Sequence, residues 1–436
     1  MKKTRSPYAL GGRTWAAVLI FGLFGQIAWV IENMYFNVFL YNTISGDTAM
    51  IAAMVSASAV TATVTTLVMG ALSDKIGKRK ALIVVGYVLW GLSVASFAFL
   101  SVDNVGKLFP AAQAAQAAAI AVVVMDCVMT FFGSTANDAA FNAWVTDVTV
   151  PENRGRVETV LAVLPLVAML VVFGALDGMT QSGNWSTFFL IVGGLTLVGG
   201  LLGIVFLKEQ PGDAQKRSDS YFANIIYGLR PSVIRANPAL YISLAALAIY
   251  SMSQQVYMPY LIIYIQHFLG IGDYVILLGG VLILSSVASV LLGKTVDKYG
   301  KLRCLTPAGV VGFIGLVLMY LARAKWFVFV GGVIMLSGGM VVSACCQGLI
   351  RDYTPRGKAG LFQGIRILFQ VLIPMVTGPF IGVAVIRNTG MTYEDLGTVK
   401  QVPTPEIFLA AAVVLLLLVV PVKLLKKREA AERSVK

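Results

Sequence analysis

The sequence is poor in charged residues. Only 13% of its 436 residues are Asp, Glu, Lys or Arg, while 58% are hydrophobic and the mean hydropathy is +0.81. An ordinary soluble domain carries about twice that charged share, roughly 25%. A chain of this composition cannot bury its apolar surface in water, so it is not a soluble globular protein and we expect an integral membrane protein.

Cysteine and histidine are also scarce. The four cysteines have no Cys-x-x-Cys spacing and all fall within long apolar runs, which argues against a disulfide scaffold and against zinc. His267 is the only histidine, so a nucleophile–histidine pair or a histidine-based metal site is not expected. A phosphate-binding loop ending at Thr295 would need a glycine where Ala288 stands. We therefore expect no enzyme, no ATP-driven pump, no cofactor and no bound metal.

Long hydrophobic runs recur from Trp15 almost to the C-terminus. A bilayer crossing needs roughly 20 mostly apolar residues. The runs predict an all-α membrane protein with twelve transmembrane helices, at residues 15–41, 50–72, 81–101, 119–147, 157–177, 186–207, 238–266, 274–294, 303–322, 326–350, 359–386 and 406–425.

Positive charge is distributed unevenly between the predicted loops. The net charge of +13 could suggest nucleic acid in a soluble protein. With a cytoplasmic N-terminus, the loops on the far side contain only five basic residues: Lys107, Arg323, Lys325, Arg387 and Lys400. The positive-inside rule therefore predicts that both termini are cytoplasmic, and it leaves no basic patch for nucleic acid. The first apolar run contains Glu32 and lacks a cleavage site, so we expect a retained helix.

A polar stretch divides the spans into two sets of six. It predicts an N-terminal bundle at 1–207, a cytoplasmic linker at 208–237 and a C-terminal bundle with a basic tail at 238–436. Within the linker, residues 221–234 have partly helical apolar spacing. Either an interfacial amphipathic helix or a plain loop fits this segment.

An internal repeat follows the second and the eighth spans. The segments GALSDKIGKRK and GKTVDKYGKLR match at one offset, with Gly70, Asp74, Gly77 and Lys78 corresponding to Gly293, Asp297, Gly300 and Lys301. A weaker echo follows spans four and ten, at Asp147 and Asp352. Parallel six-helix halves are typical of one large class of transporters.

With this repeat the chain resembles the major facilitator superfamily over essentially its whole length. The superfamily has a Gly-x-x-x-Asp-x-x-Gly-Arg/Lys-Arg/Lys segment after its second helix, which here ends on Lys78 and Arg79. The resemblance implies two six-helix bundles that work by alternating access, with both loops acting as gates. The glycines permit a tight turn, and Asp74 can accept hydrogen bonds at a helix N-terminus. A turn that only sets topology is the alternative.

Three carboxylates stand out inside predicted spans, where each costs about 2.5 to 3.5 kcal/mol on insertion scales. Asp138 precedes Asp147 by nine residues, about 14 Å along a helix, which places it near mid-membrane. Glu32 is likewise deep. These two are our candidates for coupling a cation, whereas we expect Asp126 near the outer interface in a solvated or helix-terminal role.

Polar side chains flank these acids and recur in the second half. Their types suit a sugar, because amides supply donors and acceptors and aromatic rings stack on C–H faces. Hydrogen bonds between helices are the alternative for the amides, and Arg366 could instead reach the membrane surface. The candidate solute contacts are Asn33, Asn37, Asn142, Trp144, Gln254, Tyr257, Gln363, Arg366 and Gln370.

Within the superfamily, three segments are similar to the glycoside-pentoside-hexuronide:cation symporters of the melibiose-permease type: FGLFGQ at 21–26, NDAAFNAWVTD at 137–147 and the following NRGRVE. Asp138 stands where that group has its helix-four cation-site aspartate. The chain departs from the pattern at Ile27, where an acid is expected, and it lacks the helix-two acids and the helix-five arginine.

This resemblance implies a cation-coupled symporter of a glycoside-like small molecule, monomeric in the lipid bilayer of the plasma membrane, which in a bacterium is the inner membrane. We expect proton coupling through Asp138 or Glu32, with sodium left open. Two other classes remain: a carrier of a lysolipid, amphiphile or drug, and a membrane sensor that transports nothing.

Overall fold

The structure is a computed structural model that describes residues 10–208, 229–355, 359–395 and 398–434. Within these residues, twelve helical segments are long and apolar enough to cross a membrane, from Gly12–Ile44 to Glu406–Ala431. The predicted number and order of spans are confirmed. All four cysteines are free thiols, as predicted.

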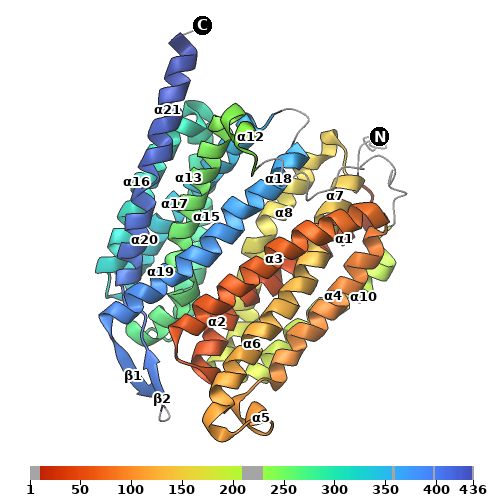
Figure 1. Ribbon diagram of the computed structural model, residues 1–436, viewed down its shortest axis with the longest axis vertical. Helices are drawn as coiled ribbons and strands as arrows, with labels where there is room; N and C mark the ends of the chain where they lie inside the picture. Colours follow the sequence, from red (N-terminus) through yellow and green to blue (C-terminus); the bar gives the residue numbers. More distant parts are fainter. Residues whose placement is uncertain (1–9, 209–228, 356–358, 396–397, 435–436) are drawn as a thin grey trace, which may run out of the picture. The chain divides into compact units, whose positions relative to one another are not determined.

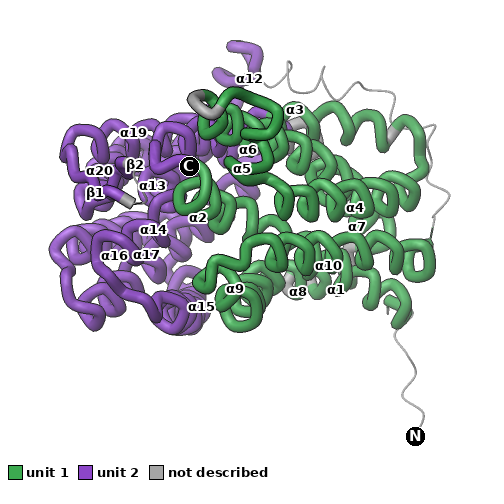
Figure 2. The backbone as a smooth tube through the Cα atoms, turned by 90° about the horizontal axis from the view of Figure 1, so that it is seen from below, with its two compact units in different colours: residues 1–44, 61–222 green, residues 45–60, 223–436 purple. Residues whose placement is uncertain are grey.

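The chain forms two compact units (Figure 2). Unit 1 comprises residues 1–44 and 61–222, and unit 2 comprises residues 45–60 and 223–436. The long helix α3 (Thr48–Ile76) begins in unit 2 and ends in unit 1. In unit 2, Thr48 on α3 donates a hydrogen bond of 2.6 Å to Gln401.

Unit 1 is built from long helices (Figure 1), and short π-helical or 3₁₀ turns, here named η, interrupt them. Besides α3, its elements are α1 (Gly12–Val30), η1 (Ile31–Tyr35), α2 (Phe36–Phe39), η2 (Leu40–Ile44), α4 (Arg79–Ser96), η3 (Phe97–Phe99), α5 (Val102–Gly106), α6 (Ala111–Gly133), η4 (Ser134–Phe141), α7 (Asn142–Val148), α8 (Pro151–Val171), η5 (Val172–Leu176), α9 (Asp177–Gln181) and α10 (Trp185–Phe206).

Unit 2 has the same character and adds one β-hairpin. Its elements are α12 (Pro231–Ala236), α13 (Pro238–Tyr257), η6 (Met258–Tyr260), α14 (Leu261–Ile263), η7 (Tyr264–Phe268), α15 (Tyr274–Tyr299), α16 (Lys301–Leu321), α17 (Lys325–Tyr353), α18 (Ala359–Ile367), η8 (Leu368–Leu372), α19 (Ile373–Thr389), β1 (Thr392–Asp395), β2 (Thr398–Gln401), α20 (Glu406–Leu416) and α21 (Val419–Ser434).

The β-hairpin is a feature that the sequence analysis missed. β1 and β2 pair antiparallel, with Thr392 opposite Gln401. The backbone N–H of Gln401 also donates to the carbonyl of Gly46 at 3.1 Å. Of the predicted linker, residues 209–228 lie outside the described chain, and only the short helix α12 is seen in the segment considered for an amphipathic helix.

Glycines let the helices of each unit approach to backbone contact. In unit 2, a Cβ added at Gly338 on α17 would lie 2.4 Å from the backbone nitrogen of Gly312 on α16. In unit 1, Gly199 and Gly203 on α10 face Phe24 and Phe21 of α1, so their spacing packs this helix against a neighbour. Small residues serve this purpose in membranes, where no hydrophobic effect holds helices together.

Candidate functional site

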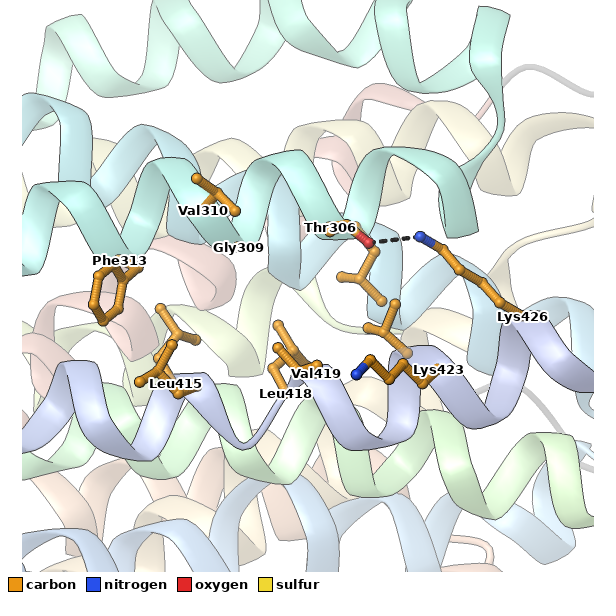
Figure 3. A pocket seen from close by; sticks show the side chains of 12 residues that line it. Thr306, Gly309, Val310, Phe313, Leu415, Leu418, Val419, Lys423 and Lys426 are labelled. Carbon is orange, nitrogen blue, oxygen red and sulfur yellow. Dashed lines mark hydrogen bonds between the residues drawn. The ribbon is translucent and has the colours of Figure 1, made fainter.

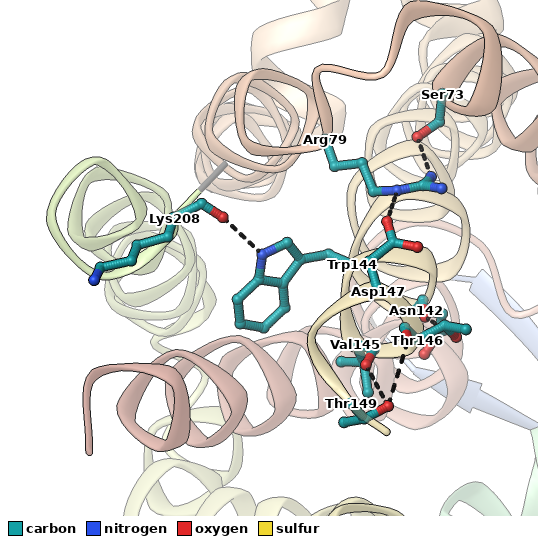
Figure 4. Close-up of polar contacts among 9 residues, drawn as sticks. All are labelled: Ser73, Arg79, Asn142, Trp144, Val145, Thr146, Asp147, Thr149 and Lys208. Carbon is teal, nitrogen blue, oxygen red and sulfur yellow. Dashed lines mark hydrogen bonds and ion pairs between the residues drawn. The ribbon is translucent and has the colours of Figure 1, made fainter. Parts of the chain in front are cut away.

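The repeated loop of unit 1 turns at Gly77, whose φ of 68° is in the left-handed region that favours glycine. The turn places Arg79, at the start of α4, against the end of α7. There its Nε donates to the carboxylate of Asp147, and its guanidinium also donates to Ser73 Oγ at 3.0 Å (Figure 4). The loop thereby joins α3, α4 and α7 through one charged network.

The loop of unit 2 has an equivalent ion pair. Gly300 has a φ of 90°, and Lys301 at the start of α16 donates to both carboxylate oxygens of Asp352 near the end of α17, at 2.8 and 2.6 Å. Asp147 and Asp352, the two positions of the weaker repeat, are therefore the acidic partners of the ion pairs in the two units. The basic partners of the two ion pairs are not at equivalent positions of the repeat, because Lys301 corresponds to Lys78 and not to Arg79.

Within the described part of the chain, the remaining predicted residues of the repeated motif do not form part of these two ion pairs. A Cβ added at Gly70 or Gly293 meets nothing within 4 Å in the described chain, so these glycines do not permit a close helix approach here. The side chains of Asp74, Asp297 and Gln363 lie outside the described part of the structure.

We expect the ion pair of unit 1 to be the stronger one. The side chains of Arg79 and Asp147 are 12% and 27% exposed, against 36% and 52% for Lys301 and Asp352. Because exposed pairs contribute about 0.2 to 1 kcal/mol, we predict a coupling of about 1 kcal/mol in unit 1 and less than about 0.5 kcal/mol in unit 2. Double-mutant cycles on the free energy of unfolding in detergent, with neutral amides as replacements, measure both. Equal couplings would contradict this prediction.

Asp138 lies in η4, a π-helical segment within the fourth membrane span. Within the described part of the chain, its carboxylate accepts one hydrogen bond, from Ser134 Oγ at 3.1 Å, and its side chain is half-buried. Among the described residues no Lys, Arg or His forms an ion pair with it. π-helical turns in membrane helices often mark functional sites, and a half-buried carboxylate without a cationic partner is costly unless it holds a proton or a cation.

Glu32 lies in η1 and is 8% exposed. Its Oε1 accepts a hydrogen bond of 2.8 Å from Thr130 on α6, a partner that the sequence analysis did not identify. Asp126, one turn earlier on α6, is only 1% exposed. The prediction of a solvated or helix-terminal Asp126 was therefore wrong, because this residue is buried and lies well inside α6.

Asn33 and Asn37 continue along the same span as Glu32. Asn33 is exposed and donates to the carbonyl of Trp29 at 2.7 Å, while Asn37 is fully buried and donates to the carbonyl of Asn33 at 2.9 Å. No described residue donates to Asn37 Oδ1. A buried acceptor without a donor is unfavourable, so a water or a solute group that donates to this oxygen would stabilise the site.

Asn142 and Trp144, the two predicted solute contacts that follow Asp138 in the sequence, have different surroundings in the structure. Asn142 is exposed, and its amide donates to the carbonyl of Asp138 at 3.2 Å. Trp144 is 2% exposed, stacks on Phe141 and donates its indole N–H to the carbonyl of Lys208 at 3.1 Å (Figure 4). Trp144 thus packs the end of α10 against α7, and a solute contact by this residue is not supported.

The segment FGLFGQ has a packing role. Asn137 donates to the hydroxyl of Tyr87 at 2.5 Å, and this hydroxyl donates to the carbonyl of Phe21 at 2.7 Å. Gly25 on α1 lies directly against the pair, since an added Cβ would be 2.2 Å from Asn137 Nδ2 and 2.6 Å from the Tyr87 oxygen.

We expect Gly25→Ala to destabilise the protein by roughly 1 to 3 kcal/mol, because the new methyl group must displace a buried hydrogen-bonded pair. Thermal unfolding in detergent measures the effect. The matched control is Gly174→Ala, at which an added Cβ meets nothing within 4 Å. An unchanged melting temperature for Gly25→Ala would show that this packing is unimportant.

A further buried carboxylate, Asp177, was missed because it stands at the end of a predicted span. Asp177 is fully buried, and it accepts hydrogen bonds from Tyr35 at 2.7 Å, from Gln181 at 2.5 Å and from Thr180 at 3.3 Å. Three donors around one carboxylate satisfy it within unit 1.

In unit 2, Gln254 and Tyr257 line a small pocket among α13, α16, α17 and α20. Its volume of about 20 Å³ suffices for one water molecule. A pocket of this size has no room for a sugar, so sugar contact by these two side chains stays a prediction.

Arg366 lies on α18 in a polar network. Its guanidinium donates to Gln347 Oε1 on α17 at 2.7 Å and to Gln370 Oε1 on η8 at 3.1 Å. Gln347 in turn donates to Ser343 at 3.3 Å. The guanidinium is thus held by two amides instead of extending to the membrane surface. Gln347 was overlooked, although it is one of few polar residues in the tenth span.

Long helices crossing the membrane, ion-paired loops repeated in both units and charged side chains within the spans define a helical membrane carrier. A family model described as Major Facilitator Superfamily matches residues 14–324 and 244–436. The chain therefore belongs to the Major Facilitator Superfamily, and it is one of its transporters.

Solved transporter structures share the fold. The nucleoside transporter NupG has a TM-score of 0.66 at 12% identity, covering 95% of this chain and 97% of that one. A bacterial homologue of the human lysosomal transporter Spinster, inward-facing and occupied, has 0.71 at 14%, covering 97% and 98%. The xylose transporter XylE from E. coli has 0.64 at 15%, covering 93% and 95%. No curated protein matches the chain. Identities this low establish the fold alone.

Proposed function

We propose that this protein is a secondary active transporter that couples a proton to the symport of a sugar-like or glycoside-like solute by alternating access. The observation that carries the proposal is Asp138, a half-buried carboxylate within a membrane span whose one described hydrogen-bond partner is Ser134. A carboxylate inside a membrane is energetically unfavourable. Reversible binding of a cation to Asp138 gives a functional reason for a carboxylate at this position.

The surroundings of Asp138 favour a proton over sodium. A proton needs one carboxylate oxygen, whereas a hard metal cation needs several oxygen ligands. In the described chain Ser134 is the only side chain that hydrogen-bonds to Asp138, and no three His, Cys, Asp or Glu side chains cluster as metal ligands. Glu32 is the second candidate for the coupling acid.

Polar groups of both units are candidates for the solute contacts. The acceptor of Asn37, the exposed amides of Asn33 and Asn142, and the network of Arg366 and Gln370 offer the donors and acceptors that hydroxyl groups require. The similarity of residues 137–147 to the melibiose-permease group supports the glycoside class. The positive-inside pattern supports cytoplasmic termini, with halves at 1–207 and 238–436 joined by residues 208–237.

The test is solute-driven proton uptake in proteoliposomes that contain a pH-sensitive dye. A panel of glycosides, hexuronides, pentoses, nucleosides and lysolipids is added at low and at high sodium, with protein-free liposomes as the control. Acidification of the lumen that starts on adding one sugar-like solute and is independent of sodium supports the proposal. Movement of a lysolipid or nucleoside alone would overturn the substrate class, and sodium dependence would overturn the choice of ion.

A further inference from the structure

The outer face of unit 2 has an elongated groove between α16 and the α20–α21 pair (Figure 3). Its volume is about 230 Å³. The walls are almost wholly apolar, formed mainly by Val310, Phe313, Leu415, Leu416, Leu418 and Val419. Leu416 and Val419 are exposed at 49% and 46%. In a membrane-spanning chain, such a face contacts lipid.

Two local features of the sequence lie at this groove. Pro421 has no backbone N–H, and α20 ends at Leu416 while α21 begins at Val419. Between them the backbone tightens, with the N–H of Leu418 donating to the carbonyl of Leu415 at 3.0 Å. Opposite, Gly309 on α16 has no side chain, and an added Cβ would already touch Leu418 at 3.4 Å.

One end of the groove is basic. Lys423 and Lys426 are three residues apart and thus on the same face of α21. Lys426 Nζ donates to Thr306 Oγ1 at 2.9 Å, which holds the ammonium group over the groove (Figure 3). Within the described chain neither lysine forms an ion pair with a carboxylate.

We propose that this groove is a binding site for one anionic phospholipid. An acyl chain lies along the apolar walls, and the headgroup phosphate is bound by Lys423 and Lys426 with Thr306 beside them. An apolar channel that ends in two cations on one helix face matches the two parts of such a lipid, whereas a zwitterionic lipid offers no net charge to the lysines. A second copy of this chain would bring further lysines against these two.

Native mass spectrometry of the detergent-purified protein tests the site, with phosphatidylglycerol and phosphatidylcholine added separately. We expect tighter binding of phosphatidylglycerol, weakened about fivefold by Lys423→Gln or Lys426→Gln and about 30-fold by both together. The matched control is Lys427→Gln, on the same turn but outside the groove lining, which should bind as the wild type does.

Filling the groove provides an independent measurement. Gly309→Leu should weaken phosphatidylglycerol binding without changing any charge, and circular dichroism verifies that the variant is folded. A melting temperature that rises with phosphatidylglycerol in the wild type, but not in the double lysine variant, gives a second readout. Equal binding of both lipids, equal losses in the Lys427→Gln control, or a dimer formed through this face would overturn the proposal.

Discussion

Asp138→Asn is expected to reduce solute-driven proton uptake to the leak rate of protein-free liposomes. Asparagine keeps the shape of the side chain and can still interact with Ser134, but it cannot exchange a proton. If Asp138 is the coupling acid, the variant should still exchange labelled solute across the membrane while it no longer accumulates solute against a gradient. Proton uptake and solute exchange are measured on the same proteoliposomes.

Stability distinguishes this result from misfolding. Replacing a half-buried carboxylate by an amide removes a charge that is unfavourable inside a membrane, so the melting temperature should stay equal or rise. Asp103→Asn, in the exposed helix α5, is the matched control and should leave coupling intact. Wild-type proton uptake in Asp138→Asn would remove this residue from the mechanism. Loss of uptake in Glu32→Gln instead would assign the coupling to Glu32.

Gly338→Val is expected to cause the largest loss of stability, about 3 kcal/mol or more. An added Cβ would lie 2.4 Å from the nitrogen and 2.8 Å from the Cα of Gly312, and 3.0 Å from the carbonyl carbon of Val311. These are backbone atoms, so α16 and α17 must separate along their contact. Folded yield and thermal unfolding in detergent measure the loss.

The control for this variant is Gly194→Val on α10, where the same substitution in a helix meets nothing within 4 Å. Its melting temperature should stay close to that of the wild type. Similar behaviour of the two variants would mean that β-branching in a membrane helix, and not the helix contact, determines the result.

Much of the fold could be predicted from local sequence because the bilayer imposes a simple rule. Every span needs a long apolar run and must satisfy its own backbone hydrogen bonds as a helix, so hydropathy alone locates it. The repeat was visible for a similar reason, since turns of the kind at Gly77 and Gly300 need glycine at one position. The hairpin β1–β2 was missed because its short, polar strands do not alternate clearly.

The site was less predictable because its contacts join residues far apart in the chain. The sequence by itself determined that Asp138 and Glu32 lie within membrane spans, since charges interrupt the apolar runs there. Only the tertiary structure decided the partners: Thr130 for Glu32, and Gln347 for Arg366. It also decided that Trp144 packs against the end of α10. Helical periodicity specifies which side chains share a face, but the packing of neighbouring helices decides what that face meets.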